Sequence, residues 1–153
     1  PDLAQLSTMI GKSVRVKERI VEEDPHETGI RKALNLGHTF GHAFEAWSLK
    51  RKPVLHGYAV AFGLMAELYL SAALKGFPAD RLRQTVGFIR AYYGSLPFTC
   101  NDYPELIELM YHDKKNRGNE INVTLLAGIG DVRIDQTVSE EEVREALDFV
   151  REG

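Results

Sequence analysis

Hydrophobic residues recur at helical spacing along most of the chain, and this pattern predicts a mainly helical protein. From about Asp2 to Glu23, apolar residues are three, four or seven positions apart, as in an amphipathic helix. Segments rich in proline, glycine or charge follow and separate further helices, expected at about Ile30 to Ser48, His56 to Lys75, Asp80 to Tyr93 and Tyr103 to His112. The helix from His56 is nearly all apolar yet interrupted by Glu67, so we interpret it as buried.

Near the C-terminus the hydrophobic period changes from helical spacing to two. Residues 121–125 and 132–134 alternate between apolar and polar, which predicts two short strands joined through Gly128 and Gly130. Two helix starts are also marked, by Asp102 with Pro104 and by a capping box that opens at Ser139. The expected fold class is mainly α: one multihelical domain over residues 1–153 with one small β-hairpin.

Composition narrows the class of protein. The chain has 153 residues, 44% hydrophobic residues and a formal net charge of −3, which gives no electrostatic reason to expect nucleic acid or a membrane as partner. Cys100 is the single cysteine, so an internal disulfide is excluded and a reducing, cytoplasmic location is expected. The chain starts without methionine and enters a helical pattern at once, so we expect it to be part of a longer protein.

Candidate chemistry is concentrated in the helix expected from Ile30 to Ser48. Arg31, Asn35, His38 and His42 stand at i, i+4, i+7 and i+11, which places them on one stripe of a helix. Most of the other positions are apolar or small, including two glycines that would let another backbone approach closely. A solvated polar face is the simpler alternative, but this composition favours a helix that lines a cleft.

Histidines at this spacing suggest a metal centre. His38 and His42 are one helical turn apart, and His56 would come within reach of His38 if two helices formed a hairpin. A catalytic zinc usually takes three protein ligands and keeps one position open. Acidic ligands remain undetermined at this point, because Asp24 and Glu27 are available but have no compelling spacing.

Three lysines are candidates for binding an anion. Lys17 lies inside the apolar stripe of the first helix, where a cation needs an anionic partner unless its stem reaches solvent. Lys114 and Lys115 belong to a basic segment that either closes over a phosphate or forms an exposed loop. The pair Gly128 and Gly130 is not a dinucleotide-binding fingerprint, because a strand pattern follows it.

Taken together, these motifs resemble 3-dehydroquinate synthase, a sugar phosphate cyclase. The resemblance is carried by residues 29–45 (GIRKALNLGHTFGHAFE), 55–63 (LHGYAVAFG) and 113–116 (DKKN), in this order. It extends over essentially the whole chain but only over the C-terminal domain of the family, so an N-terminal NAD-binding domain is expected to be outside this chain. Tyr58 departs from the family, which commonly has glutamate there, and altered local hydrogen bonding is expected.

The resemblance implies the chemistry and a role for each motif residue. Enzymes of this family use NAD and zinc or cobalt to convert 3-deoxy-arabino-heptulosonate 7-phosphate into 3-dehydroquinate and phosphate in the shikimate pathway. His38 and His56 would bind the metal together with a glutamate upstream of this chain, and His42 would be the acid–base residue. The substrate would be bound by Lys17, Arg31, Asn35 and either Lys114 or Lys115, with Glu27 as a further acidic position.

Two alternatives remain open from the sequence. The chain could belong to another sugar phosphate cyclase, such as a 2-deoxy-scyllo-inosose synthase, or it could be a non-catalytic helical interaction domain. The complete enzyme is expected to be a homodimer. The isolated chain is expected to fold but to be inactive and to bind neither NAD nor zinc tightly.

Overall fold

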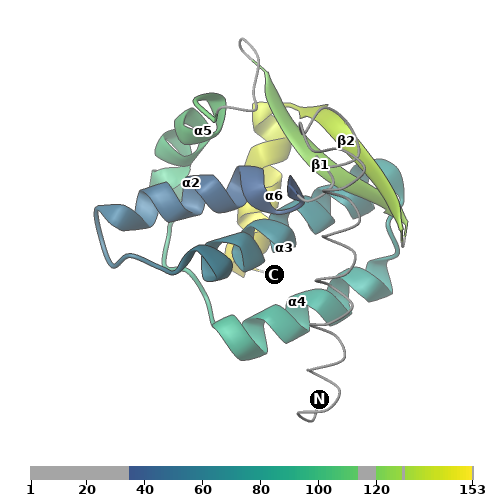
Figure 1. Cartoon of the computed structure of the whole chain (residues 1–153), viewed down its shortest axis with the longest axis horizontal. Coiled ribbons are helices and arrows are strands. Elements are labelled where there is room, and N and C mark those ends of the chain that lie inside the picture. Colours follow the sequence, from purple (N-terminus) through teal and green to yellow (C-terminus); the bar gives the residue numbers. More distant parts are fainter. Residues whose placement is uncertain (1–34, 114–119, 129, 153) are drawn as a thin grey trace, which may run out of the picture. The chain divides into compact units, whose positions relative to one another are not determined.

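The computed structural model describes residues 35–113, 120–128 and 130–152 (Figure 1). Within this part of the chain the fold is mainly helical with a single antiparallel hairpin, as the sequence predicts. The elements are α2 (His38–Leu49), α3 (His56–Lys75), α4 (Ala79–Tyr93), a short 3-10 turn η2 (Cys100–Asp102), α5 (Tyr103–Tyr111), β1 (Ile121–Gly128), β2 (Asp131–Val138) and α6 (Glu140–Glu152). The helix expected from Asp2 to Glu23 lies outside the described residues.

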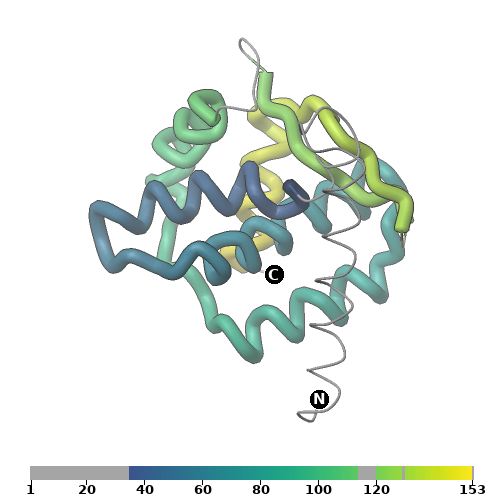
Figure 2. Tube along the Cα trace, in the orientation of Figure 1, coloured from purple at the N-terminus to yellow at the C-terminus, as the bar shows by residue number. Residues whose placement is uncertain are grey.

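Helix α3 is the centre of this fold. It packs against α2, α4, α6 and β1, and the trace in Figure 2 shows these elements arranged around it. Its length and hydropathy would also suit a membrane span, but 56% of the relevant window is buried inside the fold. The nearly continuous apolar sequence is therefore explained by contacts on several sides, which agrees with the buried helix expected from the sequence.

Helices α2 and α3 cross at glycines, with their backbones in direct contact. A Cβ atom on Gly63 would overlap the carbonyl oxygen of Gly37 and lie only 2.5 Å from the backbone nitrogen of Gly41. A Cβ on Gly41 would in turn lie 3.0 Å from the Cα of Val60. Any side chain at these positions would separate the two helices, so the close approach expected from Gly37 and Gly41 is confirmed.

The first of these glycines also corrects the predicted start of α2. Gly37 has φ +84°, a left-handed conformation that an α-helix cannot contain, and α2 begins only at His38. Asn35 therefore lies in a turn before the helix, and the prediction of one helix running through Asn35 and His38 is wrong. Periodicity cannot distinguish a glycine inside a helix from one that starts it.

The hairpin is longer than predicted and is bonded to both central helices. Strands β1 and β2 pair from Ile121 opposite Val138, with irregularities in register along β1. Gly128 is the last residue of β1, whereas Gly130, at φ +78°, lies in the turn. The Leu126 amide donates to the Ser71 hydroxyl of α3 at 2.9 Å. A bond of 3.0 Å from the Thr39 hydroxyl to a β1 carbonyl ties the strand to α2.

Both predicted helix starts are confirmed, and the predicted capping box at Ser139 is formed. The Ser139 hydroxyl accepts from the Glu142 amide at 3.1 Å, and the Glu142 carboxylate accepts from the Ser139 amide at 2.9 Å. Asp102 is the N-cap residue of α5 and Pro104 lies in its first turn, but the Asp102 carboxylate accepts from the Thr99 amide at 2.8 Å and closes η2. Cys100 is exposed in this turn.

The glycine crossing gives a first prediction. Gly63→Ala should lower the free energy of unfolding by about 1–3 kcal/mol or more, because its methyl group would collide with the backbone of α2. Gly87 of α4 is the matched control, since a Cβ there would meet nothing within 4 Å. Gly87→Ala should instead raise stability by about 0.5–1 kcal/mol. Urea denaturation of both variants measures this, and equal effects would refute the crossing.

A second prediction concerns Tyr103, where α5 meets α6. Burial, and then a hydrogen bond of 2.6 Å to Asp148, raises the pKa of Tyr103 from 10.0 to about 12. The raised pKa means that this tyrosine stabilises the fold fully below pH 10, and that the contribution is lost as pH rises towards 12. Two pKa units correspond to about 2–3 kcal/mol.

Unfolding of the chain and of its Tyr103→Phe variant, followed from pH 9 to 12, measures this contribution. The free energies of unfolding of the two proteins should converge as the pH rises. A constant difference across this range would contradict the assignment.

Candidate functional site

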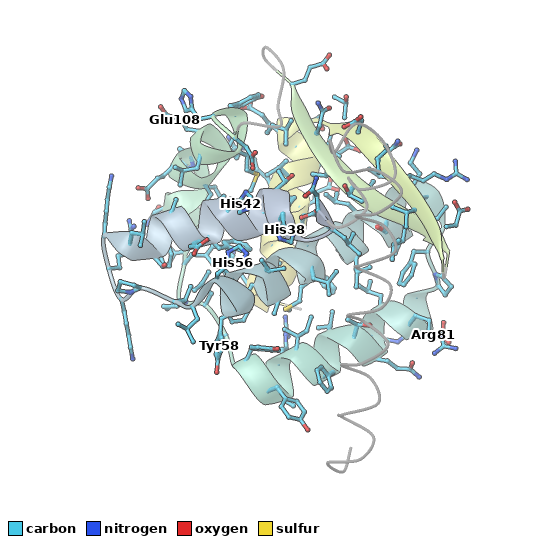
Figure 3. The ribbon with its side chains drawn as sticks, in the orientation of Figure 1. His38, His42, His56, Tyr58, Arg81 and Glu108 are labelled. Atoms are coloured by element: carbon cyan, nitrogen blue, oxygen red, sulfur yellow. The ribbon has the colours of Figure 1, made fainter. Side chains whose placement is uncertain are left out.

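Three histidines from two helices converge where α2 and α3 run side by side (Figure 3). The ring centroids of His38 and His42 are 5.4 Å apart, those of His38 and His56 5.6 Å, and those of His42 and His56 6.0 Å. His38 opens α2, His42 follows one turn later, and His56 opens α3. The helical hairpin that the sequence required for His56 to reach His38 is therefore present.

Each of the three rings has its Nδ1 beside an oxygen acceptor. For His38 the acceptor is the carbonyl oxygen of Leu36 at 3.2 Å. For His42 it is Oδ2 of Asp113 at 3.2 Å, and for His56 it is Oε1 of Glu45 at 2.9 Å. When Nδ1 carries the proton, the lone pair of a neutral imidazole is on Nε2. These partners therefore fix both the tautomer and the direction of each ring.

The cluster lies at the surface, and its carboxylate partners are more buried than its rings. The His42 side chain is 38% exposed, whereas that of Asp113 is only 5% exposed. His56 and Glu45 form a more open pair, at 55% and 32%. Small molecules can therefore reach the rings, while the groups that orient them belong to the protein framework.

The connection between α2 and α3 is held by local bonds that set the relative position of the helices. The Ser48 hydroxyl donates to the carbonyl of Glu45 at 2.7 Å and accepts from the amide of Val54 at 3.2 Å. Arg51 donates to the Trp47 carbonyl at 2.7 Å, and its guanidinium lies 4.4 Å from the centroid of the Trp47 ring. It also pairs with Glu105 of α5 at 3.2 Å. The loop is therefore bonded to both α2 and α5.

Part of the predicted site can be placed in the structure. His38, His42 and His56 are brought together, and Asn35 is half-buried in the turn that precedes α2. The other predicted substrate-binding and acidic positions lie outside the described residues; they are Lys17, Asp24, Glu27, Arg31, Lys114 and Lys115.

The histidines of the described part of the chain are suitable ligands for a divalent metal ion such as zinc, but they do not form a complete metal site. Imidazole nitrogens with oriented Nδ1 protons are suitable ligands for zinc or cobalt. However, no group of three His, Cys, Asp or Glu residues within residues 35–113, 120–128 and 130–152 has the arrangement to hold a metal ion. The chemistry of the residues fits a metal, but these segments supply only part of a coordination sphere.

Two partners of the histidines were not assigned from the sequence. Glu45 is seven residues after His38, so helical spacing alone could have placed it near the cluster. Asp113 belongs to the basic segment after α5, and its contact with His42 joins positions 71 residues apart, which no local pattern indicates. Tyr58, the departure from the family motif, packs edge-on against Tyr93 of α4, with ring centroids 4.8 Å apart.

Comparison with known proteins identifies the class to which this arrangement belongs. The chain is a domain of a sugar phosphate cyclase of the 3-dehydroquinate synthase type. The profile described as "3-dehydroquinate synthase C-terminal" matches residues 1–116. The chain belongs to the 3-dehydroquinate synthase family and corresponds to its C-terminal domain.

Curated relatives carry the same name. The chain is 61% identical over 149 residues to a 3-dehydroquinate synthase of Parabacteroides distasonis, which covers 97% of the chain and 42% of the relative. It is 38% identical over 143 residues to that of Leptospira interrogans, covering 93% of the chain and 39% of the relative. The chain thus spans about two fifths of the length of these relatives.

Solved structures share the fold at low sequence identity. A 2-deoxy-scyllo-inosose synthase complexed with carbaglucose-6-phosphate, NAD+ and Co2+ superposes with a TM-score of 0.76 at 20% identity, covering 97% of this chain and 42% of that one. A 2-epi-5-epi-valiolone synthase from Streptomyces hygroscopicus with NAD+ and Zn2+ bound gives 0.75 at 21% identity, covering 95% and 40%.

Proposed function

We propose that this chain is the C-terminal domain of an enzyme that converts 3-deoxy-arabino-heptulosonate 7-phosphate into 3-dehydroquinate and phosphate, in the shikimate pathway. The observation that carries the proposal is the convergence of His38, His42 and His56, each with its Nδ1 beside an oxygen acceptor. A non-catalytic interaction domain would have no need of three oriented imidazoles at its surface. Membership of the family supports the same assignment.

Two of these histidines would hold a divalent metal in the complete enzyme. We assign this role to His38 and His56, which come from different helices and whose ring centroids are 5.6 Å apart. Solved cyclases with NAD+ and Co2+ or Zn2+ support zinc or cobalt as the metal and NAD as the second cofactor. When bound, the metal would polarise a substrate oxygen and NAD would accept and return a hydride. Glu45 orients the His56 ring through its Nδ1.

The third histidine, His42, would move protons during the reaction. Asp113 accepts from Nδ1 of His42, so Nε2 is the atom that takes a proton from the substrate and returns it. The low exposure of the Asp113 side chain keeps this orientation fixed while the outer edge of the ring remains accessible. His42 is thus the proposed acid–base residue, and Asp113 positions it.

The remaining predicted residues would bind the anionic substrate. Lys17, Arg31 and either Lys114 or Lys115 are cations suited to phosphate and carboxylate, and Asn35 supplies an amide for hydroxyl groups. Asp113 is next to Lys114 in sequence, so the segment that holds His42 continues directly into the proposed phosphate-binding lysines. An N-terminal NAD-binding domain, a homodimeric assembly and a cytoplasmic location complete the proposal.

A second candidate function is the cyclisation of another sugar phosphate. It is favoured by the fold shared with a 2-deoxy-scyllo-inosose synthase. The identity of 61% to a 3-dehydroquinate synthase, against 20% to that cyclase, supports the shikimate substrate. Turnover of the heptulosonate phosphate and of glucose 6-phosphate by the longer protein would decide between them.

The proposed roles predict that two groups of substitutions differ in their effect on bound metal. His38→Ala or His56→Ala should remove bound metal and abolish turnover, and Glu45→Gln should weaken metal binding by about 10–100-fold. His42→Ala should keep the metal and slow turnover by about 10²–10⁴-fold, and Asp113→Asn should act in the same direction. Metal content by atomic absorption, with phosphate release in parallel, measures both properties.

The assignment would be inverted if His42→Ala lost its metal while His38→Ala retained it. The exposed His112 provides a matched control, since His112→Ala removes an imidazole that pairs only with Glu108 among the described contacts. This variant should change neither metal content nor rate.

A further prediction concerns residues 1–153 by themselves. We expect no phosphate release and no micromolar NAD binding, because the chain spans only about two fifths of its relatives. Fusing it behind the part of the Parabacteroides distasonis enzyme that it does not match should restore both properties. Calorimetric titration with NAD and a phosphate-release assay compare the two proteins. Tight NAD binding by the unfused chain would overturn this prediction.

A further inference from the structure

The N-terminus of α2 has no cap from its own sequence. The N-cap position is Gly37, which has no side chain to accept a hydrogen bond, and the first turn contains no acidic residue. The hydroxyl of Thr39 is used elsewhere, since it donates to the Asn122 carbonyl of β1. The first backbone N–H groups of an α-helix have no partner within the helix, so they need acceptors from outside. The helix that carries His38 and His42 therefore depends on another element.

A buried carboxylate of α3 supplies one of these acceptors. Oε2 of Glu67 accepts from the backbone amide of Phe40 at 3.4 Å, and Glu67 is completely buried. Burying a carboxylate is costly unless it is hydrogen-bonded, whereas the N-terminus of a helix is a favourable place for a negative charge. The hydrogen bond to the Phe40 amide thus gives a structural reason for the presence of Glu67 in the middle of an apolar helix.

The position of Glu67 follows from the same face of α3 that builds the rest of the site. His56, Val60, Gly63 and Glu67 are spaced by four, three and four residues, which places them on one stripe of the helix. The first carries a ring of the cluster, the next two touch the α2 backbone at its glycines, and the last reaches the first turn of α2. Backbone contact at Gly63 brings the carboxylate one turn later close enough to accept from Phe40.

We propose that Glu67 is a positioning residue for the histidine cluster, acting in two ways through one carboxylate. It caps the first turn of α2 and thereby fixes His38, whose ring is bonded to Leu36 before the helix. In its ionised form the carboxylate also offsets the positive end of the α2 dipole, equivalent to about half an elementary charge. The charge of Glu67 matters because, in the proposed function, His38 would bind the metal cation near the N-terminus of α2 and His42 would face it. The second part rests on the proposed metal-binding function.

Two variants separate the hydrogen bond from the charge. Glu67→Gln keeps an oxygen acceptor but is neutral, and Glu67→Ala removes both. In the metal-free 153-residue chain, the Phe40 amide should exchange its hydrogen at about the unsubstituted rate in Glu67→Gln, and about tenfold faster or more in Glu67→Ala. In the fused protein, zinc affinity by chelator competition should fall by about 2–5-fold in Glu67→Gln and about 10–100-fold in Glu67→Ala.

Ser71→Ala is the matched control for loss of stability alone. Ser71 is buried one turn after Glu67 on the same helix, and its hydroxyl bonds to the Glu67 carbonyl and to the Leu126 amide of β1. Ser71→Ala should lower the free energy of unfolding. It should leave the zinc affinity unchanged, and it should not change the hydrogen exchange of the Phe40 amide once the effect of global unfolding is taken into account.

The proposal would be overturned if Glu67→Ala and Ser71→Ala behaved alike in both measurements, or if both Glu67 variants bound zinc as the unsubstituted protein does. Failure of the proposed function has a different signature, since the unsubstituted fused protein would then bind no zinc. In that case the exchange rate of the Phe40 amide would still decide whether Glu67 is the cap.

Discussion

Backbone contact between α2 and α3 is the constraint on which the rest of this structure depends. Gly37, Gly41 and Gly63 leave no space for a side chain where the helices cross, so the two backbones approach until they touch. This distance allows His56 of one helix to meet His38 and His42 of the other. The contacts of α3 with β1, α4 and α6 then hold the pair in place.

The polar groups follow the same geometry and connect the site to the surrounding elements. Asp113 reaches His42 from the end of α5, and Arg51 ties the loop between the central helices to Glu105 of α5. The hairpin is bonded to α3 through Ser71. The bonds made by Asp113 and Glu105 thus join α5 and the residues after it to the central pair of helices, and the bond at Ser71 joins the hairpin to α3.

Sequence periodicity predicted the type of nearly every described element, because element type follows from local spacing. It placed His56 within reach of His38 on the condition that the two helices form a hairpin, which they do. It failed where the deciding information is conformational or distant in sequence. From its spacing Gly37 is expected inside a helix, but its positive φ places it at the N-cap, just before α2 begins. Asp102 is the N-cap residue of α5 as expected, but the sequence does not show that its carboxylate accepts from Thr99 instead of from α5. The contact of Asp113 with His42 requires the tertiary fold.

The crossing of α2 and α3 also has an evolutionary consequence. Residues 37–67 contain the touching glycines, the three imidazoles and the buried carboxylate within one short helical hairpin. Such a segment can be inherited as a unit while the surrounding surface diverges. Selection on this segment should act most strongly against added volume, so a methyl group at Gly63 would be less tolerated than most changes of charge on the exterior.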